Sequence, residues 1–169
     1  LYLDLVKRWP KDDLADDSLH LAAEAALSDG KLDVGEQLVA RFAKEYGSSS
    51  LRMYNRILTG RLATARGGEK HLQAAAQHFR GVVKESNVPR TRSLARFQLA
   101  RTLQQLNDDA GVLEVATPLV TEVAKVGAAS EFVDVLIIAA SSQLALKKYA
   151  EATSSTSLYL KLNPQGEQR

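Results

Sequence analysis

Hydrophobic residues recur along most of this chain at the three- and four-residue spacing of amphipathic α-helices. Leu72, Ala75, Phe79 and Val82, for example, share one face of a helix predicted over residues 70–85. Similar spacing predicts helices over 33–46, 53–65, 110–126 and 150–162, and further apolar runs begin near residues 19, 97 and 136. Residues typical of β-strands cluster in only a few places, so the pattern predicts an all-α fold.

Turn-forming residues separate these predicted helices into pairs. Breaks within pairs fall at 29–31, 67–68, 107–109 and 147–149, and breaks between pairs fall at residue 10, 47–50, 87–89, residue 127 and 163–164. The result is four helix–turn–helix units, at about 11–47, 48–88, 89–128 and 129–164, preceded by the tail of another unit at 1–10. One helical hairpin cannot bury its apolar face alone, so we expect the units to stack into a single domain over 1–169.

The units repeat in sequence as well as in pattern. The run Leu-His-Leu-Ala-Ala begins at Leu19, and Leu-Ile-Ile-Ala-Ala begins at Leu136, 117 residues later, which equals three periods of 39. The chain begins at Leu1, inside a predicted helix and without an initiating methionine, so we expect it to be a segment of a longer protein.

These features resemble the tetratricopeptide repeat. Tyr149 and Ala152 match the family's Tyr-x-x-Ala second-helix start, Pro164 matches its closing proline, and Gly35 stands where its second-helix alanine normally sits. Small residues belong at such positions because two helices cross closely there. The units depart from the family in length, near 39 residues instead of 34, and in lacking the first-helix tryptophan.

The resemblance implies a right-handed α–α superhelix, or solenoid, of antiparallel helix pairs whose first helices line a concave groove for partner segments. A different α-solenoid is the structural alternative. The longer units are similar to those of bacterial cell-envelope repeat proteins, which implies an envelope or periplasmic location. Pro118 lies inside the predicted helix 110–126 and should kink or break it near Glu114, because proline removes a backbone donor.

Composition excludes several functional classes. The chain is 45% hydrophobic and 25% charged, which is typical of a globular protein, and no apolar run approaches the roughly 20 residues of a membrane span. It has no cysteine and no recognisable nucleophile, zinc or phosphate-loop motif, so we predict no enzymatic activity, metal or cofactor. His71 and His78 are interpreted as a surface pair, since zinc ligands on a helix are usually closer in sequence.

Charge is distributed unevenly along the chain. Residues 1–46 carry six basic and ten acidic side chains, a net charge of −4. Residues 47–106 carry eleven basic and two acidic side chains, a net charge of +9. Residues 107–169 carry five basic and eight acidic side chains, a net charge of −3. Nine of the eleven central basic residues are arginines, which suit carboxylate recognition. The basic centre could therefore bind an acidic partner, or the acidic flanks could fold back and neutralise it. Nucleic acid is disfavoured, because only Tyr54 and Phe97 lie among these arginines as stacking platforms.

The predicted function is a non-catalytic protein–protein interaction scaffold that binds a protein or peptide in the groove, with an acidic segment as the candidate partner of the arginine-rich centre. The candidate partner-binding residues are Arg52, Arg56, Arg61, Phe97, Arg101 and Gln104. Further groove positions implied by the resemblance are His20, Glu24, Tyr54, Asn55, Asp134, Ile137 and Ser141. The alternatives are a structural spacer or self-association segment with open solenoid ends, and a docking or regulatory domain of an enzyme whose catalytic part lies elsewhere.

Overall fold

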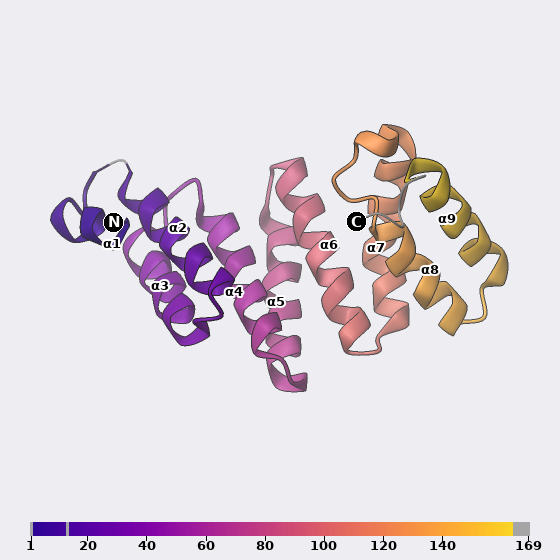
Figure 1. The fold of residues 1–169 in the computed structure, drawn as a ribbon, viewed down its shortest axis with the longest axis horizontal. Helices are drawn as coiled ribbons and strands as arrows, with labels where there is room; N and C mark the ends of the chain where they lie inside the picture. Colours follow the sequence, from indigo (N-terminus) through magenta and orange to yellow (C-terminus); the bar gives the residue numbers. More distant parts are fainter. Residues whose placement is uncertain (1, 13, 164–169) are drawn as a thin grey trace. The chain divides into compact units, whose positions relative to one another are not determined.

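The computed structural model describes residues 2–12 and 14–163, which form nine α-helices and no β-strand (Figure 1). The predicted all-α class is confirmed. Pro164, expected to close the last repeat, lies outside the described residues. The helices are α1 (Tyr2–Arg8), α2 (Ala15–Ser28), α3 (Leu32–Glu45), α4 (Arg52–Arg66), α5 (Glu69–Glu85), α6 (Pro89–Gln105), α7 (Asp109–Val126), α8 (Val135–Ala145) and α9 (Tyr149–Leu162), with a short 3₁₀ turn, η1 (Gly127–Ala129).

Within each of two parts of the chain, α1 to α5 and α6 to α9, consecutive helices pack against each other. The strongest packing joins α2 with α3, α4 with α5, α6 with α7 and α8 with α9. The chain divides into two compact units, Leu1–Asn87 (unit 1) and Val88–Arg169 (unit 2). Unit 1 contains α1 to α5 and unit 2 contains α6 to α9, so the division falls between the second and third predicted repeats. The single domain over 1–169 stays a prediction.

Two of the turns inside the pairs, α4–α5 and α6–α7, use backbone conformations that their residues favour. Gly67 and Gly68, between α4 and α5, both have positive φ, at 72° and 77°. Between α6 and α7, Asn107 takes a positive φ of 56°, and the Asp108 side chain then caps α7 by accepting a hydrogen bond from the Gly111 N–H at 2.9 Å. The ends of these helices are therefore determined by residues close to them in the sequence. This is why the sequence pattern predicted where the helices end.

The predicted break in the helix that contains Pro118 is wrong, because α7 runs without interruption from Asp109 to Val126. Pro118 is exposed, so the carbonyl that loses its helical donor can face water. The side chain of Thr117 donates a hydrogen bond to the Leu113 carbonyl at 2.6 Å, one turn back along the helix. Packing of α7 against both α6 and α8 supplies the stability that the missing backbone bond removes.

The interior of unit 1 depends on two glycines where helices cross closely. A Cβ atom at Gly35 of α3 would lie 2.6 Å from Cδ2 of Leu62 in α4, and one at Gly60 of α4 would lie 2.6 Å from Cε1 of Phe79 in α5. Leu62 and Phe79 are both fully buried. The small-residue position inferred at Gly35 is thus a site where even alanine is too large.

Gly60→Ala tests the tightness of the α4–α5 crossing. The new methyl group would press on a rigid, buried ring, an overpacking that costs about 1–3 kcal/mol, while alanine recovers about 1 kcal/mol of helix propensity. We expect a net loss of stability, measured by urea unfolding. The exposed Ala65→Gly change in the same helix measures the propensity contribution separately. A Gly60→Ala protein more stable than the parent would contradict this description of the crossing.

Candidate functional site

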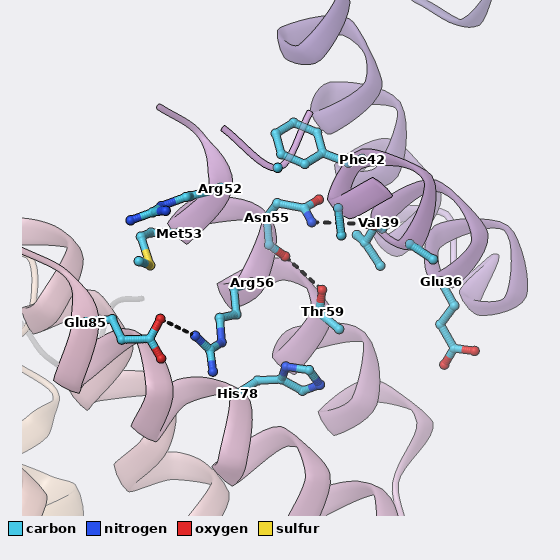
Figure 2. A pocket seen from close by; sticks show the side chains of 13 residues that line it. Glu36, Val39, Phe42, Arg52, Met53, Asn55, Arg56, Thr59, His78 and Glu85 are labelled. Carbon is cyan, nitrogen blue, oxygen red and sulfur yellow. Dashed lines mark hydrogen bonds and ion pairs between the residues drawn. The ribbon is translucent and has the colours of Figure 1, made fainter. Parts of the chain in front are cut away.

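The principal cavity of unit 1 is a pocket of about 470 Å³ between α3, α4 and α5 (Figure 2). Its volume lies within the range of pockets that hold drug-sized ligands or anchoring side chains. Three helices and one loop residue line it: Glu36, Val39, Ala40, Phe42 and Ala43 from α3, Gly47 from the loop that follows α3, Arg52, Met53, Asn55, Arg56 and Thr59 from α4, and His78 and Glu85 from α5. We call this the α3–α5 pocket.

The floor of the α3–α5 pocket is one face of α4. Arg52, Asn55, Arg56 and Thr59 recur at the three- and four-residue spacing that places side chains on the same side of a helix. Both α3 and α5 pack against α4. The pocket is therefore the space left above α4 where its two neighbours diverge, and side chains of small or apolar residues such as Val39 and Ala43 form its α3 wall.

Asn55 ties the floor to the α3 wall. Its buried amide donates a hydrogen bond through Nδ2 to the Val39 carbonyl at 3.1 Å, as Figure 2 shows. Its Oδ1 has no hydrogen-bond partner among the described residues. Asn55 was predicted to face the first-helix groove together with Tyr54, and that placement of Asn55 is wrong, because the side chain turns toward α3. Periodicity could not reveal this, since a polar residue on a helix is expected to face solvent.

Three of the four charged residues that line the α3–α5 pocket, Glu36, Arg56 and Glu85, form ion pairs. Nη1 of Arg56 lies 2.8 Å from Glu85, and Nε of Arg66 lies 2.8 Å from Glu36. Burial and the nearby Arg56 charge lower the pKa of His78, so its imidazole is neutral at pH 7. Arg52 is exposed and forms no ion pair with any residue that the structure describes. Of these groups, Arg52 leaves an uncompensated positive charge at the rim.

The six predicted partner-binding residues fall into separate groups. Arg52 and Arg56 line the α3–α5 pocket. Arg61, also on α4, is outside its lining and pairs with Glu24 of α2 at 2.8 Å. The other three belong to α6 of unit 2, where Arg101 lies over the Phe97 ring at 5.9 Å and Gln104 is half-buried. No described pocket contains all six.

Much of the arginine-rich centre is neutralised within the protein. Of the nine arginines, four form ion pairs: Arg56 with Glu85, Arg61 with Glu24, Arg66 with Asp33 and Glu36, and Arg90 with Glu131. Three of these four use acids from the flanking segments. The alternative in which the acidic flanks fold back on the basic centre therefore holds for these positions, and a basic belt formed by the other arginines stays a prediction.

Four further groove positions, His20, Asp134, Ile137 and Ser141, are not part of the lining of the α3–α5 pocket. His20 of α2 is half-buried, packs edge-on against Phe42 with ring centroids 6.2 Å apart, and has its pKa lowered by burial. Ile137 and Ser141 are exposed on α8 of unit 2, and Asp134 is exposed just before that helix. Their role in a groove stays a prediction.

Several pocket residues were not predicted from the sequence. Val39 and Phe42 carry only the signal of a core face, and His78 carries only that of a surface pair with His71. Glu85 offered the clearest signal, because it is one of just two acids within the net +9 centre. An acid retained among eleven basic residues indicates a specific ion pair, which the structure shows with Arg56.

No cluster of three or more histidine, cysteine or acidic residues that could hold a metal ion occurs in residues 2–12 and 14–163. No helix in the same part of the chain is long and apolar enough to cross a membrane. No protein-family model matches the chain, and a comparison with curated protein sequences found no significant match.

Proposed function

We propose that this chain is a non-catalytic protein-binding scaffold of the tetratricopeptide-like class, with its helix pairs arranged as an α–α superhelix. The consecutive pairing of helices and the small residues at their crossings support this architecture. We place the binding site in the α3–α5 pocket rather than across the whole arginine-rich centre, because four of the nine central arginines already form ion pairs with described residues.

The observation that carries this proposal is an apolar pocket with an unneutralised arginine at its rim. Val39, Phe42, Ala43 and Met53 line the cavity with apolar side chains. The Arg52 side chain lies next to Met53 (Figure 2). Such a surface fits a partner segment in which a residue with an apolar side chain is followed or preceded by a residue with a carboxylate. Arginine binds carboxylates through two parallel hydrogen bonds, and buried apolar anchors supply most of the binding free energy at such interfaces.

Arg52→Gln is expected to weaken binding of an acidic probe peptide, in which two leucines are flanked on each side by a glutamate. Loss of one charge-assisted contact at a solvent-exposed rim corresponds to roughly a three- to tenfold rise in Kd. Fluorescence polarisation with labelled peptide at low and high salt measures the effect. The matched control is Arg80→Gln, which removes the same charge from an exposed position of α5 outside the pocket.

Two results would overturn the proposal. One is equal weakening by Arg52→Gln and Arg80→Gln, which would mean that only net charge matters. The other is equal affinity for the acidic probe and for a probe whose leucines are replaced by serine, which would exclude an apolar anchor in the α3–α5 pocket.

A further inference from the structure

Arg56 occupies a fixed position at the wall of the α3–α5 pocket, one helical turn from Arg52. Its guanidinium rests directly on the backbone of α5 at Gly81, where a Cβ atom would collide with the terminal nitrogen and lie 3.0 Å from Nε. Glu85, one turn further along α5, accepts a hydrogen bond from Nη1 at 2.8 Å. The missing side chain of Gly81 leaves room for the guanidinium beside α5, where a carboxylate other than that of Glu85 can also reach it.

Glu85 itself is held weakly. It is the last residue of α5, where the helix dipole disfavours negative charge. Its side chain is 50% exposed, and exposed or half-exposed ion pairs contribute little to stability because solvent screens them. Arg56 is its described partner. A carboxylate from outside can therefore replace the Glu85 carboxylate at small cost.

We infer that Arg56 is a second carboxylate subsite of the α3–α5 pocket, occupied by Glu85 in the free protein and by a partner's carboxylate in the complex. This inference rests on the proposed function and defines its partner more narrowly. Arg52 and Arg56 are neighbours on the surface of α4, with Cβ atoms about 6 Å apart, as is general for residues four apart on a helix. The recognised segment then carries two carboxylates that flank an apolar anchor, one for each arginine.

The internal competitor also shapes specificity. A segment with a single carboxylate binds Arg52 and leaves the Arg56–Glu85 pair intact. A neutral segment binds neither arginine. A segment with two carboxylates gains the second contact only by displacing Glu85, whose charge also repels it. Removing the Glu85 charge should therefore strengthen binding of the doubly acidic segment more than binding of the singly acidic one.

Glu85→Gln provides the test, by fluorescence polarisation with the acidic probe and with versions that keep one glutamate or none. We expect the acidic probe to bind Glu85→Gln roughly two- to fivefold more tightly than the parent protein, the gain that corresponds to losing one exposed competing ion pair. The single-glutamate probe should gain less and the neutral probe nothing.

Glu45→Gln is a closely matched control. Glu45 is the last residue of α3, pairs with Arg41 at 2.9 Å, and is half-exposed, but it does not line the α3–α5 pocket. The substitution removes the same charge from a similar ion pair. A second variant, Gly81→Ala, displaces the Arg56 guanidinium from its position beside α5 without changing any charge. Combined with Glu85→Gln, it should abolish the gain in affinity for the acidic probe that Glu85→Gln produces alone.

The outcomes separate this inference from the proposed function. Equal affinity gains in Glu85→Gln and Glu45→Gln, with binding still dependent on Arg52, would overturn the Arg56 subsite and leave the pocket as a binding site. Persistence of the gain in the Gly81→Ala, Glu85→Gln double variant would also overturn it. Absence of binding by the acidic probe to the parent and to Glu85→Gln would overturn both.

Discussion

Phe79→Ala is expected to lower the free energy of unfolding by about 3–5 kcal/mol, the largest stability effect that we expect from a single substitution in unit 1. Phe79 is fully buried in α5, and its ring fills the space left by the missing side chain of Gly60 in α4. Alanine would remove most of the ring and leave a cavity. The surrounding helices can close that cavity only in part, because Gly60 has no side chain with which to fill it.

Urea unfolding followed by far-ultraviolet circular dichroism measures the change in stability. Hydrogen exchange of amides in α4 and α5 reports whether the loss is centred on their contact. Gln77→Ala is the control, since Gln77 is exposed on the same helix two residues away. A loss below about 1 kcal/mol for Phe79→Ala would show that the ring is not packed as described.

Leu62→Ala is expected to lower the free energy of unfolding by about 2–5 kcal/mol. In the presence of Leu62→Ala, a second substitution, Gly35→Ala, should change from destabilising to stabilising. Leu62 is fully buried in the hydrophobic cluster formed by α1 to α4. In the parent protein, a methyl group at Gly35 would lie 2.6 Å from Leu62, so Gly35→Ala should be destabilising, by about 1–2 kcal/mol. Once Leu62 is truncated, the same methyl group enters vacated space, and Gly35→Ala should become stabilising by about 1 kcal/mol through helix propensity.

A double-mutant cycle over the two positions tests this reversal. Denaturant unfolding of the parent, both single variants and the double variant yields the coupling free energy directly. Residues in contact show coupling, whereas residues without shared contacts have additive effects. Additivity within about 0.5 kcal/mol would contradict the close crossing of α3 and α4 at this point.

The fold was largely predictable from the sequence. The predicted helix 70–85 differs from α5 only at its first residue, and the predicted helix 33–46 is displaced from α3 by a single residue. These predictions succeeded because apolar spacing and turn residues act over a few neighbouring positions. The helix around Pro118 was predicted less well, since a local rule about proline was outweighed by the packing of α7 between α6 and α8.

The candidate site was predicted only in part. Arg52 and Arg56 were identified from their spacing and from the charge imbalance, and both line the α3–α5 pocket. The sequence did not distinguish them from Arg61, which is paired with Glu24, or from Arg101 of unit 2. Which of several arginines keeps a free guanidinium depends on the acid that folding brings beside it, and that acid can be about thirty residues away, as Glu85 is from Arg56.

By itself, then, the sequence determined an all-helical chain of paired helices, the positions of its turns, and the need for small residues such as Gly35 where helices cross. Those properties arise from interactions between near neighbours along the chain. The tertiary structure alone decided that α3 and α5 leave a pocket above α4 and that Asn55 turns inward. It also decided that Glu85 pairs with Arg56, while Arg52 forms no ion pair among the described residues. Pockets and ion pairs depend on distances between side chains from different helices, and packing sets those distances to within an ångström.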